Sequence, residues 1–204
     1  MEFDERERRY GREEYYWGTT PNDLARETVE YAPDRETPTL VDVGAGEGRD
    51  AVYFAEREFD VLATDVSPNG LAKAERLAAE RDVSIRTLEA DVNDLTLPES
   101  VDVLYSCGAI QYLRPANRDE QFARFRAATT PGGLHVLFAF VDHPDVPTPP
   151  DWTSEEQFYA PGEVRSYYDE WTVLDERELV FEDDSGGEPH EHAAEVVLVR
   201  KPTE

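Results

Sequence analysis

The chain has 204 residues, enough for one domain with a sizeable core, and its 39% apolar content is typical of a globular protein. Its 46 acidic and 20 basic residues give a net charge of −26, which would repel nucleic acid and anionic lipid. No apolar run approaches the ~20 residues of a membrane-spanning helix, and the N-terminus lacks the apolar core of a secretory signal.

The acidic residues are spread along the whole chain, and lysine occurs only twice, at Lys73 and Lys201. We therefore expect a salt-rich cytoplasm, where a short Debye length screens self-repulsion. The single cysteine, Cys107, cannot form an intramolecular disulfide and fits the same compartment. We expect a small-molecule partner, no nucleic acid or membrane partner, and a monomer or homodimer.

The first 32 residues predict a helical segment that covers the rest of the domain. Residues 1–14 are highly charged and favour a surface helix, and the aromatic pair Tyr16 and Trp17 follows beside turn residues. Residues 21–31 have helical spacing, with Thr20 as the expected N-cap and Pro21 at the first helical position. We interpret the aromatic pair as a lid over a ligand; packing at the edge of the core is the alternative.

Apolar runs typical of buried strands then alternate with helical patterns. We expect strands over residues 39–43, 60–64, 84–88, 101–106 and 134–141. Helices are expected after the first two strands and over residues 117–129, where Pro131, Gly132 and Gly133 would end the last one. The proline-rich residues 142–160 predict a lid-like loop.

The C-terminal part predicts a short helix over residues 161–170 and two β-patterned runs, 171–182 and 193–200. A hairpin-type turn at residues 183–187 would make these two strands antiparallel neighbours. The whole pattern predicts one α/β domain over residues 1–204, with a doubly wound, mostly parallel sheet and an antiparallel C-terminal hairpin.

In such sheets, ligands bind at the carboxyl ends of the strands. Glycines at every second position, Gly44, Gly46 and Gly48, follow the first expected strand, and Asp65 and Asp91 end the next two. A dinucleotide fingerprint needs a wider glycine spacing, and Asp42 just before the turn would oppose a pyrophosphate. A cationic, phosphate-free ligand such as S-adenosylmethionine fits better, although Asp65 and Asp91 could also be helix or turn caps.

Seven segments carry a resemblance to a known family: VDVGAGEGRDAVYFA, VLATDVS, EADVNDL, VDVLYSCGAIQYL, PGGLHVLFAF, FYAPGEVRSYYDEW and PHEHAAEVVLVRKP. Together they resemble the class I S-adenosylmethionine-dependent methyltransferases, and more closely their tellurite-resistance, TehB-like branch. The resemblance covers nearly the whole chain and implies a seven-stranded sheet whose last strand is antiparallel.

The resemblance also implies cofactor-binding roles. The backbone of Gly44, Ala45 and Gly46 would contact the methionine part, with Asp42 near its amino group. Asp65, followed by Val66, would bind the ribose hydroxyls. Asp91 and Val92 would bind the adenine edge, and Cys107 and Gly108 would line the wall near the sulfonium. Arg49 would reach the methionine carboxylate, and an ordinary surface salt bridge is the alternative for it.

Methyl transfer to a soft nucleophile, such as a thiol or a selenium or tellurium oxyanion, needs alignment and desolvation more than a strong base. We expect Tyr16, His190 and His192 to position the acceptor, with Trp17, Tyr112 and His143 as further candidates. His190 and His192 are two residues apart and would share one face of a strand. We expect no metal centre, and the two histidines could instead face solvent.

Two departures from the family pattern bear on the acceptor. Tellurite-methylating members carry a His-Arg pair near the start of the last hairpin, where this chain has Val180, Phe181 and Glu182. The sequence after the fourth strand, SCGA, is not the D/N-P-P-Y used on nucleobase amines. Methylation of another O- or N-acceptor, a nicotinamide reductase and a non-catalytic S-adenosylmethionine-binding protein remain as alternatives.

Overall fold

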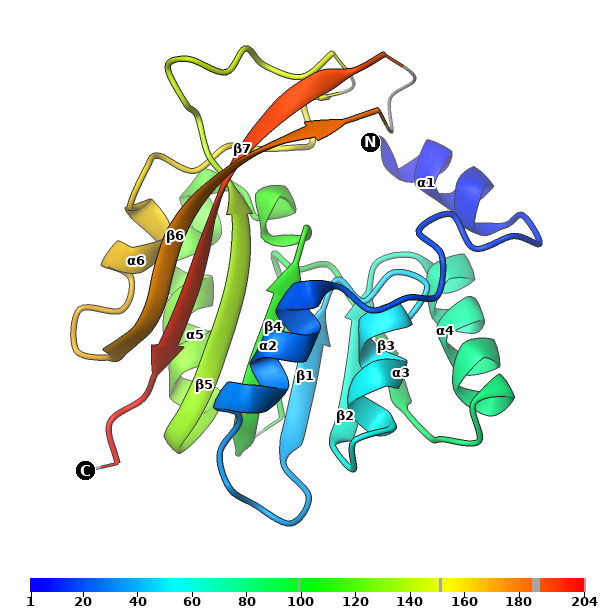
Figure 1. The fold of residues 1–204 in the computed structure, drawn as a ribbon, viewed down its shortest axis with the longest axis vertical. Helices are drawn as coiled ribbons and strands as arrows, with labels where there is room; N and C mark the ends of the chain where they lie inside the picture. Colours follow the sequence, from blue (N-terminus) through cyan, green and yellow to red (C-terminus); the bar gives the residue numbers. More distant parts are fainter. Residues whose placement is uncertain (99, 151, 185–187, 204) are drawn as a thin grey trace.

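The computed structural model describes residues 1–98, 100–150, 152–184 and 188–203. Its centre is a seven-stranded sheet with the order β3-β2-β1-β4-β5-β7-β6 (Figure 1). The first five strands are parallel, and β7 runs antiparallel to both β5 and β6. This confirms the predicted mixed sheet with an antiparallel C-terminal pair. The strands are β1 Thr39–Val43, β2 Asp60–Asp65, β3 Arg86–Glu89, β4 Val101–Cys107, β5 Thr129–Phe140, β6 Thr172–Asp183 and β7 His190–Arg200.

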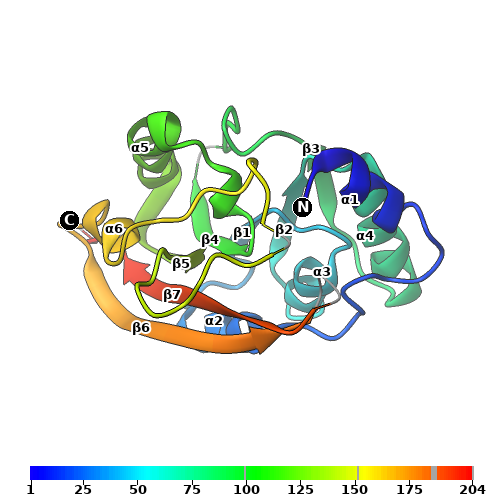
Figure 2. The same cartoon turned by 90° about the horizontal axis from the view of Figure 1, so that it is seen from above.

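Helices cover both faces of the sheet, with α5 and α6 on one side and α2 and α3 on the other (Figure 2). The helices are α1 Phe3–Tyr10, α2 Asp23–Tyr31, α3 Arg49–Ala55, α4 Pro68–Glu80, α5 Arg118–Ala128 and α6 Glu163–Ser166, with 3₁₀ turns at Ile110–Tyr112 and Pro115–Asn117. Among the described helices, none is both long and apolar enough to cross a bilayer.

Alternation along the strands sorts apolar side chains into two cores, one on each face. In β1, Val41 and Val43 pack with Phe122 and Phe125 of α5, whereas Leu40 packs with Phe54 of α3. Parallel strands buried on both faces need this two-sided apolar content. Both cores therefore hold the carboxyl ends of β1, β2 and β4 at one edge of the sheet.

Three predicted boundaries were wrong. The helix expected from residue 21 begins at Asp23, because the Asn22 backbone and side-chain N–H groups donate to Asp50 and keep the preceding residues extended. Pro131, Gly132 and Gly133 lie inside β5 and not before it; the strand accommodates them with an irregular register against β4. The helix expected over residues 161–170 shrinks to α6.

The other strand bounds agree better, although β7 begins at His190, three residues before the expected start at residue 193. The bounds of β1 were predicted to the residue, and those of β2, β3 and β4 differ by one or two residues. Of the expected hairpin turn at 183–187, residues 185–187 lie outside the described residues, and the antiparallel pairing of β6 with β7 is confirmed. Ser67 caps α4, since its Oγ accepts the Gly70 N–H at 2.9 Å.

Candidate functional site

A cavity of about 1750 Å³ opens at the carboxyl ends of the parallel strands. Pockets that hold a single drug-sized ligand usually measure ~300–1,000 Å³, so this one has room for two small molecules. It is lined by the residues after β1, β2, β3 and β4, by the N-terminal segment and by β6 and β7. This position of the cavity agrees with the prediction that ligands bind at the carboxyl ends of the strands.

The glycine turn after β1 forms one wall of the cavity. Gly44 has a φ of +80°, and a Cβ placed on it would lie 2.0 Å from the Cβ of Ala109. Only glycine fits there, because both the backbone conformation and the close approach exclude a side chain. The Gly44 and Ala45 N–H groups donate to the Thr64 carbonyl at 2.8 and 2.9 Å, which joins the turn to the end of β2.

Asp65 ends β2 and fixes the same turn from the other side. Its Oδ2 accepts the Gly46 N–H at 2.8 Å, and its Oδ1 accepts the Ser67 N–H at 2.9 Å. Burial raises the pKa of this carboxyl, and the backbone donors partly offset that rise. A carboxylate offers about four lone-pair positions, so each oxygen keeps capacity for a further donor. Val66, the next residue, also lines the cavity.

Asp42 is a buried acid of the site. Its side chain is 2% exposed, and its Oδ2 has no hydrogen-bond partner among the described residues. Burial, followed by the nearby Asp50 and Asp65 carboxylates, holds the pKa of Asp42 well above its usual value. A buried carboxylate oxygen of this kind costs free energy unless a donor satisfies it, so the position suits a cationic ligand group.

Asp91 and Val92, which follow β3 in the chain, also line the cavity. Asp91 Oδ1 accepts both the backbone and the side-chain N–H of Asn93 at 2.8 Å. This is the turn-capping geometry raised as the alternative for Asp91. Its other oxygen lies 3.9 Å from Arg114, and its side chain is 43% exposed, so Asp91 retains an accepting oxygen at the cavity rim.

Cys107 and Gly108 form the wall that follows β4. Burial raises the pKa of the Cys107 thiol to about 12, which makes this cysteine a poor nucleophile. Gly108 has a φ of +80° and faces open space. Arg49 lines the cavity as well and donates to the Trp17 carbonyl at 3.1 Å, so it holds the N-terminal segment in this structure.

Two acids beside the glycine turn were not identified as site residues from the sequence. Asp50 accepts the Asn22 backbone N–H at 2.7 Å and the Tyr105 hydroxyl at 2.9 Å. Glu47 accepts the Trp17 N–H at 3.1 Å and pairs with Lys73. Both anchor the N-terminal segment over the cavity. Their position within the turn itself, GEGRD, was the available signal.

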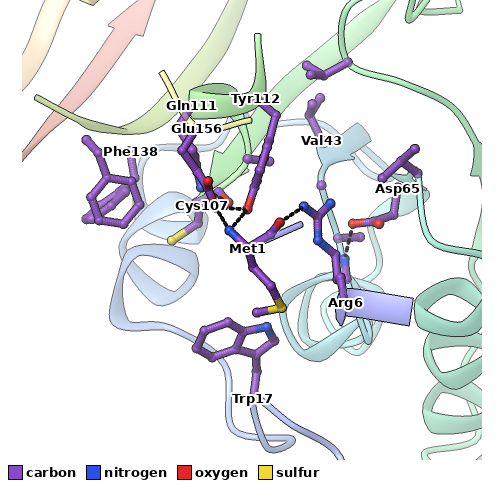
Figure 3. Close-up of a pocket in the computed structure, with 18 of the residues that line it drawn as sticks. Met1, Arg6, Trp17, Val43, Asp65, Cys107, Gln111, Tyr112, Phe138 and Glu156 are labelled. Carbon is purple, nitrogen blue, oxygen red and sulfur yellow. Dashed lines mark hydrogen bonds and ion pairs between the residues drawn. The ribbon is translucent and has the colours of Figure 1, made fainter. Parts of the chain in front are cut away.

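The N-terminal helix reaches into the cavity, which a surface helix would not do. The Met1 amino group pairs with Glu156 and lies 3.5 Å from the Tyr112 hydroxyl, while Arg6 donates to the Met1 carbonyl at 3.0 Å (Figure 3). Tyr16 and Trp17 lie on the cavity wall, with Trp17 42% exposed. Residues 152–157 of the expected lid loop complete this side.

The two C-terminal histidines share one face, as predicted, since their Nε2 atoms lie 3.0 Å apart. His192 is buried and lines the cavity together with Asp183; His190 stands behind it and is not part of the lining. His143 also lies outside the lining. The alternative in which both histidines face solvent is wrong for His192.

Part of the chain matches a known family. Residues 40–133 match the family model described as "Methyltransferase domain". One curated relative is "Hemagglutinin 1" of Eikenella corrodens, which is 29% identical over 90% of this chain and 60% of its own length. Another is a probable S-adenosyl-L-methionine-dependent methyltransferase, TehB of Haemophilus influenzae, which is 24% identical over 70% of this chain and 49% of its own length. The chain thus spans about half to three fifths of these relatives.

Solved structures share the fold. The crystal structure of TehB from Haemophilus influenzae superposes with a TM-score of 0.76 at 22% identity, over 88% of this chain and 61% of that one. The N-methyltransferase NodS from Bradyrhizobium japonicum, crystallised with S-adenosyl-L-homocysteine, has a TM-score of 0.72 at 12% identity, over 98% of both chains. Over residues 40–133 the chain is therefore similar to methyltransferases, and as a whole it has the fold of the TehB and NodS structures.

Proposed function

We propose that this protein transfers the methyl group of S-adenosylmethionine to a small-molecule acceptor. The observation that carries the proposal is Asp42, a buried carboxylate whose Oδ2 lacks a hydrogen-bond donor within the described residues and which lines the cavity beside the glycine turn. A ligand with an ammonium group, a sulfonium and no phosphate satisfies this acid, whereas a pyrophosphate would be repelled by it.

The residues around the cavity fit the parts of this cofactor. Asp42 would accept from its ammonium group, Asp65 from the ribose diol, and Asp91 with the Val92 amide from the adenine edge. The remaining contacts would come from Gly44, Ala45, Gly46, Arg49, Val66, Cys107 and Gly108. When bound, S-adenosylmethionine supplies an electrophilic methyl group on a positively charged sulfur.

The acceptor half of the cavity is largely aromatic. Phe138, Phe140, Trp152 and Phe181 line it beside His192. Apolar walls exclude water and so favour displacement by a weakly hydrated, soft nucleophile that needs no strong base. We therefore favour a thiol or a selenium or tellurium oxyanion as the acceptor. Tyr16 and His192 would position the acceptor, and His190, which is outside the lining, would act through its contact with His192. An O- or N-acceptor, or cofactor binding without turnover, is the alternative.

The net charge of the chain bears on its partners and its compartment. A net charge of −26 disfavours nucleic acid and anionic membranes as partners. A salt-rich cytoplasm and a monomer or homodimer remain part of the proposal.

Calorimetry with S-adenosylhomocysteine tests the cofactor assignment. Asp65→Ala should weaken binding by more than about tenfold, because a bidentate acceptor for the ribose and the anchor of the glycine turn are both lost. Asp60→Ala, at the exposed start of the same strand, is the matched control and should bind as the parent protein does. Unchanged affinity in Asp65→Ala, or tighter binding of NADH than of S-adenosylhomocysteine, would contradict the assignment.

Turnover tests the reaction. Formation of S-adenosylhomocysteine is measured with a panel of thiols, selenite, tellurite and hydroxyl or amine acceptors. Turnover with a soft acceptor supports the proposal. Cofactor binding without turnover on any of them would favour a non-catalytic binding protein.

A further inference from the structure

We infer that Asp183, His190 and His192 form a binding site for a divalent transition-metal ion, with Zn²⁺ as the ion that suits it best. Among the described residues, one oxygen of Asp183 and one ring nitrogen of each histidine lie within 4.8 Å of one another. No metal centre is expected from the sequence. Metal binding at this site stands independently of the proposed methyl transfer.

The antiparallel register of β6 and β7 builds the cluster. Asp183 pairs directly with His190, and His192 lies two residues further along β7, on the same face of the sheet. Directly opposed residues and next-but-one neighbours on a strand are the pairs whose side chains meet. Two rigid strands therefore bring the three donors together.

A backbone contact fixes the orientation of the His190 ring. Its Nδ1 lies 2.7 Å from the Glu188 carbonyl, which can only accept, so Nδ1 donates and Nε2 points toward Nε2 of His192. A ring N–H held by a backbone carbonyl is the arrangement that orients metal-binding histidines.

The distances between the donors suit a single ion. His190 Nε2 lies 3.0 Å from His192 Nε2, which in turn lies 3.4 Å from Asp183 Oδ2. An ion bonded at ~2.0–2.1 Å to nitrogen and oxygen donors in tetrahedral geometry separates them by roughly 3.4 Å. Small rotations of the side chains would open the cluster to that spacing.

The donor set selects the class of metal. Two imidazoles and one carboxylate suit Zn²⁺ or Fe²⁺, whereas Mg²⁺ and Ca²⁺ prefer oxygen donors alone. Rings of Phe140 and Phe181 lie 4.9 and 5.5 Å from the His192 ring, centroid to centroid, and form an apolar shell. Such a shell limits water at the ion and strengthens its electrostatic attraction for ligands.

Three protein ligands leave a coordination position open, which is typical of metal ions that bind a substrate. Asp183 and His192 line the same cavity as Asp42 and Asp65, so the open position can face the acceptor space. A thiol that binds there loses its proton to solvent and remains as a thiolate. This role in acceptor binding rests on the proposed function; the metal site does not.

The experiment is a titration of the untagged 204-residue chain with Zn²⁺ at high KCl, which suppresses diffuse binding to the acidic surface. We expect one ion per chain. Asp183→Asn and His190→Ala should each weaken Zn²⁺ binding by more than about tenfold. Removing a residue that only hydrogen-bonds to a metal ligand already costs at least about tenfold in affinity, so removing a ligand should cost more. His190 is only partly buried, so its variant should fold, and thermal melting checks this.

Two variants control for charge and for histidine number. Asp184→Asn removes the same charge one residue away, and His143→Ala removes a histidine outside the cluster. Both should bind Zn²⁺ as the parent does. With Co²⁺ as the probe, the parent should show the visible absorption of a four- or five-coordinate site, and His190→Ala should lose it.

The inference is overturned if the parent shows no saturable binding, or if Asp183→Asn and His190→Ala bind as tightly as the two controls. In that case the three residues form only a hydrogen-bonded cluster. Binding of S-adenosylhomocysteine is measured on the same samples, so a failed metal site with intact cofactor binding leaves the proposed function standing. Lost cofactor binding with intact metal binding contradicts that function alone.

Discussion

The Lys73 ammonium lies 2.6 Å from the Glu47 carboxylate, and the two side chains are 7% and 1% exposed. This ion pair joins the middle of α4 to the glycine turn, and Lys73 also donates to the Glu14 carbonyl at 2.5 Å. One of only two lysines in the chain thus connects the cofactor turn to the N-terminal segment.

Removing one partner should be costly, because the other charge remains buried. Lys73→Met is expected to lower the free energy of unfolding by about 3–5 kcal/mol, measured by urea denaturation. Glu120→Gln, which breaks the exposed pair of Glu120 with Arg124, is the control and should cost less than about 1 kcal/mol. Equal effects of the two substitutions would show that burial of Lys73 contributes nothing.

Alanine substitutions at Gly44 and Gly18 allow the cost of backbone strain to be distinguished from that of steric overlap. Both have positive φ, +80° and +70°, but a Cβ would meet Ala109 at Gly44 and nothing within 4 Å at Gly18. Gly18→Ala should cost about 1–2 kcal/mol from the left-handed backbone alone. Gly44→Ala should cost a further ~1–3 kcal/mol from overpacking and also weaken S-adenosylhomocysteine binding. Similar unfolding energies for the two variants would contradict the close approach of Gly44 to Ala109.

His135 makes stability sensitive to acid. It is fully buried between Thr129 Oγ1 at 2.7 Å and the Tyr168 hydroxyl at 2.8 Å, and burial lowers its pKa from 6.5 to about 3. As the pH falls below 6.5, this histidine takes up a proton in the unfolded chain but not in the folded protein. The stabilising contribution of the neutral ring to the free energy of unfolding is therefore complete above pH 6.5 and is lost as the pH falls towards about 3.

The matching measurement is the free energy of unfolding between neutral and mildly acidic pH. The parent should lose up to ~1.4 kcal/mol per pH unit more than His135→Gln in this window. His143→Gln, in the partly exposed loop after β5, should follow the parent. Parallel pH profiles for the parent and His135→Gln would contradict the burial of a neutral ring.

The net charge predicts a strong dependence of stability on salt. At low ionic strength the Debye length is long, and like charges across the surface repel one another; at molar salt it falls to about 3 Å. The melting temperature should therefore rise steadily with KCl. A protein equally stable in dilute buffer would show that its acidic surface is not an adaptation to salt.

The sequence predicts local features of this protein better than long-range ones. Thr39–Val43 is apolar and bounded by turn residues, so β1 was predicted to the residue, and the acids Asp42 and Asp65 were placed at strand ends by the same pattern. The contact of Met1 with Glu156 joins two segments that share no periodicity, and sequence patterns do not report such contacts.

Tertiary pairing also overrides local preference at two places. Pro131 and the two following glycines read as a break, yet β5 continues through them because Gly132 donates to the carbonyl of Lys201 and is held there. The cluster of Asp183 with His190 and His192 depends on the register of two strands, which composition alone does not fix.

The sheet order leaves two outer strands, β3 and β6, whose free edges could pair with another molecule. The four-residue β3 offers too short an edge for stable addition. In β6 the exposed Val180 lies between the exposed Glu178 and Glu182 on the same face. A second copy docking along this strand would bring carboxylates against carboxylates, so the hairpin that carries the histidines is also protected against fibrillar association.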